Sequence, residues 1–354
     1  MVSQIKVHAF TSITANYLPK ARVLAQTLRS FHPEMPLHAV LCDAIPPGVR
    51  LEDEPFASFL TLPELIPGRW RQWVFMHRLV EAATGVKGFA LRRLLEDSSC
   101  EAVLYFDPDI VVLAPLDGLL QRFTRASILL TPHLTEPEWT LEGVADHEIS
   151  ALRHGAFNLG FLGVKKSDEG LRFARWWAAR LDHFCFDDIP AGLFTDQRWM
   201  DLAPALFAGL EIVRDPEYNV CTWNLSHRRV SGAPDSGWLV NGRPMVFYHF
   251  SGIDSGAQEI MLRKYGQGMP ALFQLREWYL DQCRRAGQAE CSRLPWSFGC
   301  YDDGELIRDA ERRLYRLRED LQTAFPDPFY TAEAERSYRH WHRTHVDMEL
   351  WSEA

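Results

Sequence analysis

The chain has no C-x-x-C pair, no long apolar run and no excess of basic residues. Its seven widely spaced cysteines argue against a zinc site or a disulfide framework and favour reduced thiols. No segment approaches the roughly 18 consecutive apolar residues that a membrane-spanning helix requires. The first ten residues, MVSQIKVHAF, lack the apolar core of a secretory leader. The net charge of −9 argues against a general nucleic-acid-binding protein. We therefore expect a cytoplasmic protein with no nucleic-acid partner.

The segment after the first expected strand contains no glycine. Apolar spacing predicts a strand at residues 5–10, a helix at 18–31 and a second strand at 36–42, which together form a β-α-β unit with parallel strands. The intervening loop TSITANY (11–17) lacks the glycines of a Rossmann dinucleotide site or a P-loop. Both of these nucleotide-binding motifs are therefore excluded.

Strands and helices alternate along most of the chain, which predicts an α/β fold. A chain of 354 residues is long enough for one large domain with an appendage. We expect a catalytic domain over residues 1–269 with a mostly parallel central sheet, and a mostly helical C-terminal extension over 270–354 packed on it. Further strands are expected at 102–106, 126–132, 157–165 and 244–252, and further helices at 73–97, 171–184 and 306–321.

Two aspartates interrupt an apolar run in the segment AVLYFDPDIVVL (102–113). Residues 102–106 are typical of a buried parallel strand, and ligands of open α/β sheets bind beyond the carboxyl ends of such strands. Carboxylates there are costly unless solvent, a basic side chain or a cation compensates their charge. Asp107 and Asp109 can hold a divalent cation with their oxygens. The alternative is an Asp-Pro-Asp surface turn.

A second group of polar residues follows an apolar strand in the segment YHFSG (248–252). His249 can supply an imidazole ligand, and Gly252 can let backbone amides approach a phosphate. A single histidine is more often an ordinary core or surface residue, so this interpretation depends on the other elements.

The order of several segments resembles a known family. FTSITANYLPKARVLAQTL, VLYFDPDIVVLAPL, FNLGF, DQRWM and HFSG are similar to segments of GT-A nucleotide-sugar glycosyltransferases. The similarity is closest to the retaining family 8 type and related bacterial polysaccharide glycosyltransferases, and it covers about residues 5–265. It implies the Rossmann-like GT-A fold of nucleotide-diphospho-sugar transferases.

The resemblance also implies roles for individual residues. Asp107, Asp109 and His249 would bind Mn²⁺ (or Mg²⁺) together with the diphosphate of the donor. The residues implied in binding the rest of the donor come from four segments: Thr11, Ser12 and Tyr17 for the base and ribose, Lys87 and Arg92 or Arg93 for the phosphates and sugar, Asn158 for the sugar, and Gly252 for the phosphates.

Asp196 and Gln197 match the family segment that faces the anomeric carbon of the donor sugar. An aspartate that binds sugar hydroxyls and a neutral amide beside the anomeric carbon suit an oxocarbenium-like transition state. The alternative for Asp196 is an N-cap of a helix that starts near Gln197, and both roles are compatible. The sequence departs from the family in having no acidic residue in the first loop and Ser255 where a lysine is common.

The function we expect is that of a hexosyltransferase-like, metal-dependent glycosyltransferase of bacterial polysaccharide or glycoconjugate synthesis. It would move a sugar from a nucleotide-diphosphate sugar, with a UDP-sugar favoured, to a glycan, lipid-linked glycan or protein acceptor, with retention. At most peripheral contact with the inner membrane surface is expected. The alternatives are a sugar nucleotidyltransferase, for which the first loop lacks glycine, and a non-catalytic protein with a degenerate site that binds nucleotide sugars or carbohydrates.

Three further patterns have ordinary structural interpretations. The histidines of HWHRTH (340–345) are expected in solvent near an exposed terminus. The basic segment ERRLYRLRED (311–320) is expected to be a solvated helix face. Trp176 and Trp177 cannot both face the core from one helix, and core packing is favoured over an acceptor groove for the pair.

Overall fold

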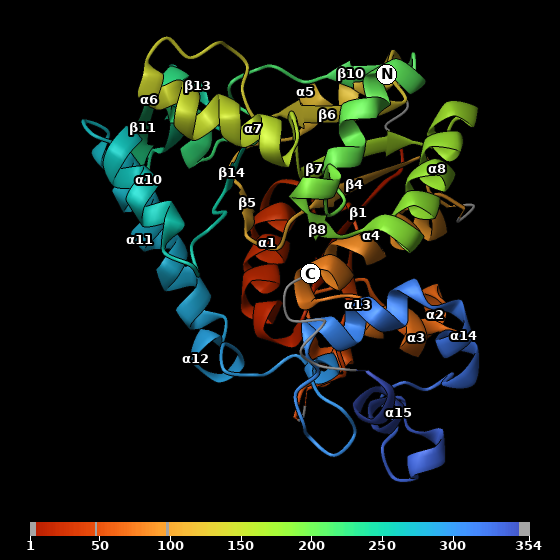
Figure 1. Ribbon diagram of the computed structural model, residues 1–354. Helices are drawn as coiled ribbons and strands as arrows, with labels where there is room; N and C mark the ends of the chain where they lie inside the picture. Colours follow the sequence, from red (N-terminus) through yellow and green to blue (C-terminus); the bar gives the residue numbers. More distant parts are fainter. Residues whose placement is uncertain (1–4, 47, 97–98, 347–354) are drawn as a thin grey trace.

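The computed structural model describes residues 5–46, 48–96 and 99–346, and its centre is a seven-stranded sheet (Figure 1). Strand β7 is antiparallel to its neighbours β4 and β6, and the other four strand pairs are parallel. The predicted α/β class and mostly parallel sheet are therefore confirmed. In spatial order the strands are β10 (Leu210–Ile212), β6 (Ile128–Pro132), β7 (Phe157–Lys165), β4 (Ala102–Phe106), β1 (Val7–Ile13), β2 (Leu37–Leu41) and β3 (Ser58–Thr61).

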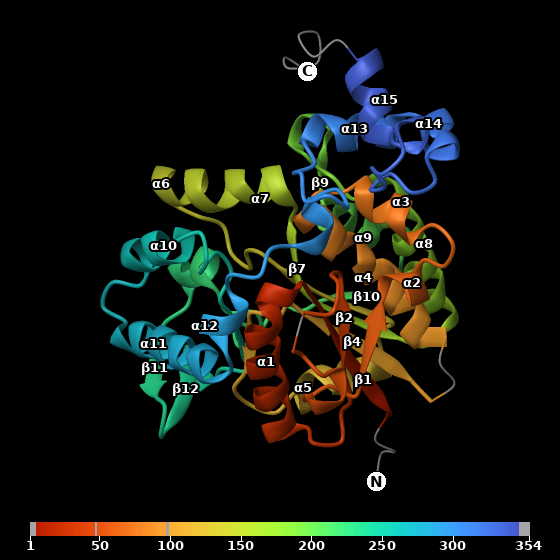
Figure 2. The same cartoon turned by 90° about the horizontal axis from the view of Figure 1, so that it is seen from below.

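Helices cover both faces of this sheet because alternate side chains of each strand point to opposite sides. On β4, Val103 and Tyr105 pack toward α4 (Leu79–Glu96) and α8 (Asp168–Phe184), whereas Leu104 and Phe106 lie in the core under α1 (Leu18–Phe31). Figure 2 shows α1 on one side of the strands and α4 with α8 on the other. A sheet buried on both faces explains why its strands are continuous apolar runs.

Two expected strand features differ from the structure. Strand β1 continues to Ile13, so Thr11 and Ser12 lie in the strand and not in the loop after it. The late strand, expected at 244–252, is the short β14 (Phe247–His249), which lies outside the central sheet. It pairs in antiparallel fashion with β5 (Ile110–Val112), because residues 110–112 continue the chain directly after the turn that leaves β4.

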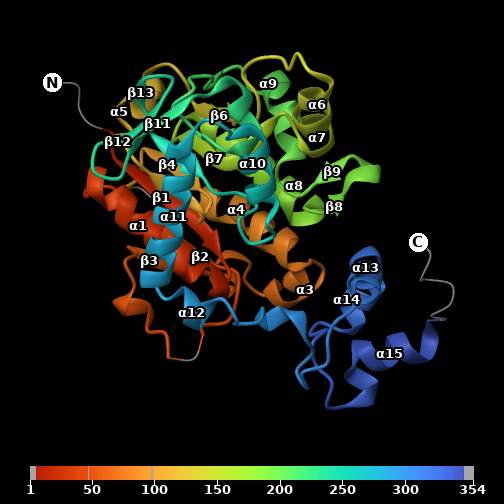
Figure 3. The same cartoon turned by 90° about the vertical axis from the view of Figure 1, so that its left-hand side faces the viewer.

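The segment after residue 269 divides into two groups of helices, which the sequence did not indicate. Helices α11 (Pro270–Arg285) and α12 (Gln288–Cys291) lie beside α1. Helices α13 (Asp309–Leu317), α14 (Glu319–Ala324) and α15 (Tyr338–His345) form a separate group near α3 (Trp70–Phe75), as Figure 3 shows. The single helix expected at 306–321 is wrong, because extended backbone at Arg318 separates α13 from α14.

The second group shares a core with α3. Phe75 is fully buried among four aromatic rings. The distance between ring centroids is 5.1 Å from Phe75 to Tyr315 and to Phe329, 5.5 Å to Tyr338 and 5.9 Å to Tyr301. Edge-to-face contacts of this kind add to the stabilisation from burial. The division of the chain into two domains at residue 270 stays a prediction. The outermost residues of the two predicted domains, 1–4 and 347–354, lie outside the described part of the chain.

Two expectations of solvated charge are confirmed only in part. His340 and His345 are exposed, as are Arg313 and Arg318, but other members of the two segments are buried. Arg312 is buried, and its guanidinium donates hydrogen bonds to the carbonyl oxygens of Phe75 (3.0 Å), His77 (2.9 Å) and Phe298 (2.5 Å). His342 is also buried, against the ring of Tyr338. Carbonyl oxygens of other segments give Arg312 an environment that local sequence does not reveal, whereas the ring beside His342 lies one turn earlier in the same helix, α15.

Trp177 is fully buried and Trp176 packs partly buried against the same core, in agreement with the core interpretation. No helix in the described residues is both long and apolar enough to cross a membrane. The remaining short elements are α2 (Leu62–Leu65), α5 (Asp117–Leu120), α6 (Leu141–Gly143), α7 (Ile149–His154), α9 (Ala203–Leu206), α10 (Ala257–Tyr265), β8 (Asp187–Asp188), β9 (Leu193–Phe194), β11 (Val230–Ala233), β12 (Gly237–Val240) and β13 (Arg243–Pro244).

Candidate active site

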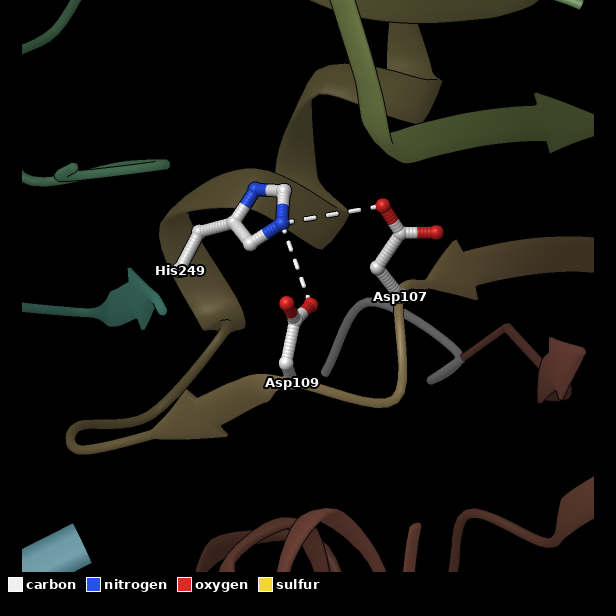
Figure 4. Close-up of side chains that lie close together, drawn as sticks. All are labelled: Asp107, Asp109 and His249. Carbon is white, nitrogen blue, oxygen red and sulfur yellow. Dashed lines mark ion pairs between the residues drawn. The ribbon is translucent and has the colours of Figure 1, made fainter. Parts of the chain in front are cut away.

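Asp107, Asp109 and His249 meet at the carboxyl end of β4 (Figure 4). Asp107 directly follows β4 and Asp109 directly precedes β5, while the β14–β5 ladder places His249 opposite Ile110. The Nε2 atom of His249 lies 3.1 Å from Asp109 Oδ1 and 3.6 Å from Asp107 Oδ2. One ligand atom from each residue lies within 4.8 Å of the others. The structure thus brings together the three residues that the sequence indicated as metal ligands.

The donor set of this cluster fits a divalent cation. Two carboxylates and one imidazole combine hard oxygen ligands with a borderline nitrogen ligand, a set that suits Mn²⁺. His249 is buried, and its other ring nitrogen, Nδ1, has no hydrogen-bond partner among the described residues. Gly160 makes room for the ring, because a Cβ at this position would lie 2.4 Å from His249 Cε1.

The charges of the cluster shift the pKa values of its members in opposite directions. Burial alone would raise the pKa of Asp109, but His249 and then Lys20 reverse this effect and lower it. Burial alone would lower the pKa of His249, but Asp109 and Asp107 reverse it and raise it. Without a cation, a protonated imidazole therefore supplies the positive charge that the two carboxylates require.

Lys87 connects this cluster to the second group of expected site residues. Its side chain is buried on α4, and its Nζ atom lies 3.1 Å from Asp107 Oδ1 and 3.0 Å from Asp196 Oδ2. Burial opposes the charge, but the two carboxylates outweigh it and raise the pKa of Lys87. The hydroxyl of Tyr105 also donates to Asp107. Asp107 therefore receives two protein donors in addition to facing the imidazole.

Asp196 does not cap a helix. The short helical turn that follows it runs from Arg198 to Leu202 and begins after Gln197, and the Asp196 carboxylate faces Lys87. Burial and then the Asp107 charge raise the pKa of Asp196, although Lys87 opposes this. The preceding Thr195 has φ of +45°, a left-handed conformation that is costly for a β-branched residue and is typical of functional sites.

Gln197 and Asn158 lie next to one another on the other side of Asp196. The Gln197 side chain accepts a hydrogen bond from the backbone N–H of Leu159 (3.1 Å) and donates one to the carbonyl of His154 (2.9 Å). Asn158 Oδ1 accepts from the side chain of Asn219 (2.9 Å). The Gln197 side-chain oxygen also accepts from the side-chain amide of Asn158 (3.5 Å). The amide of Gln197 is thus held in a fixed orientation, with one N–H left for a ligand.

Two connected clefts meet at the cluster. The first, which we name the β1 cleft, has a volume of about 300 Å³ and is lined by the end of β1, by Tyr17 just before α1 and by the first turns of α4. The second, the β9 cleft, has a volume of about 540 Å³ and is lined by β9 and the residues after it. Both clefts are bordered by Lys87, Asp107 and His249. The residues Asn158, Asp196 and Gln197 line only the β9 cleft.

Of the three residues expected to hold a base and ribose, Ser12 and Tyr17 lie at the β1 cleft, and so does Gly252, which was expected at the phosphates. Gly252 has the positive φ of +76° that favours glycine. Thr11 is fully buried beside the cleft without lining it. Arg92 does not reach either cleft, because its side chain is exposed near the end of α4 and lies 3.9 Å from Glu96.

Lys20 is a charged neighbour of the cluster that the sequence did not indicate, although it lines neither cleft. Its buried ammonium group pairs with Asp254, which follows β14, and lies 4.0 Å from the centre of the Tyr17 ring. Tyr17 donates to the same carboxylate (2.6 Å). Lys20 lies on the predicted helix at 18–31, but only the return of residues 249–254 to α1 brings its charge near Asp109. Gly160 and Tyr105 were missed for the same reason, since their roles depend on contacts across the fold.

No family model matches the chain. It is 28% identical over 154 residues to Uncharacterized protein YfnF of Bacillus subtilis (strain 168), which is 43% of this chain and 50% of that protein. It is 27% identical over 154 residues to Uncharacterized protein YfnD of the same organism, with 43% of this chain and 47% of that protein covered. The matched part thus spans about half the length of these curated relatives.

The solved structures to which the chain is similar include three glycosyltransferases. A complex of galactosyltransferase LgtC with donor and acceptor sugar analogs has a TM-score of 0.46 and 16% identity, covering 82% of this chain and 97% of that chain. GlyE of Streptococcus pneumoniae TIGR4 has a TM-score of 0.43 and 13% identity, covering 79% and 64%. Mouse xyloside xylosyltransferase 1 has a TM-score of 0.42 and 16% identity, covering 69% and 97%.

Proposed function

We propose that this protein is a metal-dependent glycosyltransferase that moves a sugar from a nucleotide-diphosphate sugar to a glycan, lipid-linked glycan or protein acceptor, with retention. The observation that carries the proposal is the position of the Asp107–Asp109–His249 cluster where the β1 and β9 clefts meet. A nucleotide in the β1 cleft and a sugar in the β9 cleft would place the diphosphate between them at this cluster.

The cation held by Asp107, Asp109 and His249, Mn²⁺ or Mg²⁺, would supply positive charge to the diphosphate as it departs. Lys87 supplies a further positive charge from the protein, because its Nζ atom lies between Asp107 and Asp196 at the border of both clefts. Ser12 and Tyr17 face the base and ribose, and Gly252 leaves space for phosphate oxygens. A UDP-sugar is the favoured donor.

Asp196 and Gln197 act on the sugar. The carboxylate of Asp196, oriented by Lys87, accepts hydrogen bonds from sugar hydroxyls, while the fixed amide of Gln197 lies with its oxygen dipole beside the anomeric carbon. An amide cannot act as the base that an inverting reaction requires. In a retaining reaction the departing phosphate can itself take the proton of the acceptor hydroxyl, so that no dedicated base is needed.

The test is a thermal-shift screen of UDP-, GDP-, TDP- and CDP-sugars with and without Mn²⁺, followed by donor turnover and proton NMR of the first product. Stabilisation by one donor in the presence of Mn²⁺, together with an α-linked product from an α-linked donor, is expected. A β-linked product would reject retention. Tight binding of a donor without turnover under any acceptor would favour the non-catalytic alternative, and formation of a nucleotide sugar from a nucleoside triphosphate would favour the nucleotidyltransferase.

The expected location is the cytoplasm, with at most peripheral contact at the inner membrane surface, where lipid-linked acceptors lie. Fractionation of cells that produce the full protein tests this expectation. Recovery in the soluble fraction at high salt, with partial membrane association at low salt, is the expected result.

A further inference from the structure

A third cleft, of about 400 Å³, lies between the start of α4, strand β8 and helix α13, and we name it the α13 cleft. It adjoins the candidate active site through the β8–β9 hairpin. Asp187 of β8 lines the α13 cleft, and its partner in the hairpin, Phe194 of β9, lines the β9 cleft. Because paired strands lie about 4.8 Å apart, little more than this hairpin separates the two clefts.

The carboxylates at the α13 cleft are largely used by neighbouring protein groups. Glu81 accepts hydrogen bonds from the backbone N–H of Arg78 (2.8 Å), the Arg78 guanidinium (2.9 Å) and the backbone N–H of Asp187 (3.0 Å). Asp187 also lies 3.8 Å from Arg78, and Asp188 accepts from the backbone N–H of Ala191 (3.3 Å). Arg78 is therefore neutralised within this group.

Two other guanidinium groups at the cleft have no carboxylate partner. Among the described residues, neither Arg312 nor Arg316 forms an ion pair within 4.0 Å, although Asp309 also lines the cleft. Arg312 is committed to three backbone carbonyl oxygens, and burial lowers its pKa to about 10. Arg316 makes no hydrogen bond with its side chain in the described part of the chain, and its guanidinium stacks 3.5 Å from the ring centre of Phe186.

Three arginines at the cleft lie on one short helix, which also carries Asp309 one turn before Arg312 and Arg313. Arg312, Arg313 and Arg316 all line the cleft from α13, and like charges one turn apart destabilise a helix. Burial lowers the pKa of Arg316, and the positive charges of Arg313 and Arg78 lower it further, whereas the negative charge of Glu81 acts in the opposite direction. The stacked guanidinium of Arg316 is held in a fixed plane with its N–H groups available, which is the geometry that recognises oxyanions.

We propose that the α13 cleft binds a phosphoryl group carried by the acceptor. A dianionic phosphoryl group would offset the charges of Arg312 and Arg316, which form no ion pair among the described residues, and accept hydrogen bonds from Arg316. The adjacent β9 cleft would then receive the acceptor hydroxyl. The assignment to the acceptor rests on the proposed glycosyltransferase function, whereas the anion site itself does not. The proposal also gives the C-terminal helices a role in choosing the acceptor.

The experiment is a calorimetric titration of the full-length protein with inorganic phosphate. The buffer contains EDTA, which removes metal ions, so that no metal-bound phosphate contributes to the signal. Saturable binding is expected in the wild type, and Arg316→Gln should weaken it about tenfold or more, the effect of losing a charge-assisted hydrogen bond. The matched control is Arg318→Gln, since Arg318 follows α13, pairs with Asp320 and lies outside the cleft. It should bind phosphate like the wild type.

Arg316→Lys keeps the positive charge but lacks the planar guanidinium. Its affinity for phosphate should lie between those of the wild type and Arg316→Gln, and it replaces Arg316→Gln as the test if that variant does not fold. Three results would overturn the proposal: no saturable binding by the wild type, equal affinity in the wild type and the Arg316 variants, or sodium acetate binding as tightly as phosphate. Unfolding temperatures of all variants identify effects that are merely structural.

Two further measurements separate this inference from the proposed function. Asp109→Asn should abolish Mn²⁺-dependent donor binding but retain phosphate binding in EDTA. The anion site can therefore be measured even if the proposed glycosyltransferase function is wrong. With any acceptor that supports transfer, inorganic phosphate should compete with that acceptor. Competition with the donor alone, or no effect of phosphate on any acceptor, would overturn the assignment to the acceptor.

Discussion

Gly160→Ala tests whether the imidazole of His249 is a metal ligand without changing any polar group. A Cβ at position 160 would lie 2.4 Å from His249 Cε1 and 2.6 Å from its Nδ1. Carbon atoms in contact are normally at least about 3.5 Å apart, so the ring must move by about 1 Å. The Nε2 atom lies 3.1 Å from Asp109, and a displacement of this size disrupts the alignment of the cluster.

We expect Gly160→Ala to weaken Mn²⁺ binding about 10- to 100-fold, the range for changes that misplace a metal ligand. Overpacking should also lower the free energy of unfolding by about 1–3 kcal/mol. Free Mn²⁺ measured by electron paramagnetic resonance gives the affinity, and thermal unfolding gives the stability. Donor turnover should fall together with the affinity for Mn²⁺.

The matched control is Gly163→Ala in the same strand. A Cβ there would lie 3.1 Å from Phe123 and 3.2 Å from Leu104, so it crowds the core on the face away from His249. Gly163→Ala should lower stability and leave Mn²⁺ affinity unchanged. In the background of His249→Ala, Gly160→Ala should cost no further affinity, because the two changes act on one contact. Unchanged Mn²⁺ binding by Gly160→Ala, or fully additive losses in the double variant, would refute the assignment of His249.

Three further predictions concern the same site. Asp107→Asn should reduce transfer more than about 100-fold while the protein remains folded, because it removes a cation ligand; turnover and unfolding temperature check this together. Gln197→Ala should lower kcat with little change in donor affinity, whereas Asp196→Ala should also weaken donor binding; donor titration and steady-state kinetics distinguish them. The pKa of His249 is raised in the folded state, so its protonation stabilises the metal-free protein, and this contribution is complete at pH values below the ordinary imidazole pKa of 6.5. The contribution is lost as the pH rises through the folded-state pKa. Thermal unfolding of the wild type and of His249→Ala across pH measures it.

Each of these predictions has a contrary outcome. Full activity of Asp107→Asn would remove the metal hypothesis. Equal effects of the Gln197 and Asp196 variants on donor binding would reject their separate roles. If His249→Ala retained the pH dependence of the metal-free wild type, the imidazole would not be the group whose proton is linked to folding.

The sequence predicted this cluster through local patterns together with the resemblance to GT-A glycosyltransferases, since the local pattern alone left the role of His249 open. Asp107 ends a buried apolar strand, and His249 follows another, so both were expected at the edge of a sheet. The reason for their contact was not predicted, since β14 lies outside the central sheet and reaches the site by pairing with β5. The roles of Lys20 and Gly160 could not be inferred from their own segments. Each depends on contact with residues 249–254, which are far away in the sequence.

Charged residues of the C-terminal helices show a different limit. The alternation of charges in 311–320 favoured a solvated face, yet Arg312 is buried. A buried guanidinium is tolerated when acceptors surround it, and its acceptors are carbonyl oxygens of residues 75, 77 and 298. Backbone acceptors have no residue-specific signal, so a local pattern cannot reveal them. The exposed position of Arg92 near the end of α4 was likewise not evident from helical spacing alone.

The shared core around Phe75 sets the order in which the protein can complete its folding during synthesis. Phe75 leaves the ribosome long before Tyr338, which covers one side of its ring. At typical translation rates this delay is on the order of tens of seconds. During that interval the surface of α3 is exposed to solvent and is available to chaperones. Premature termination between residues 213 and 338 should therefore yield an aggregation-prone chain even though all strands of the central sheet have been made.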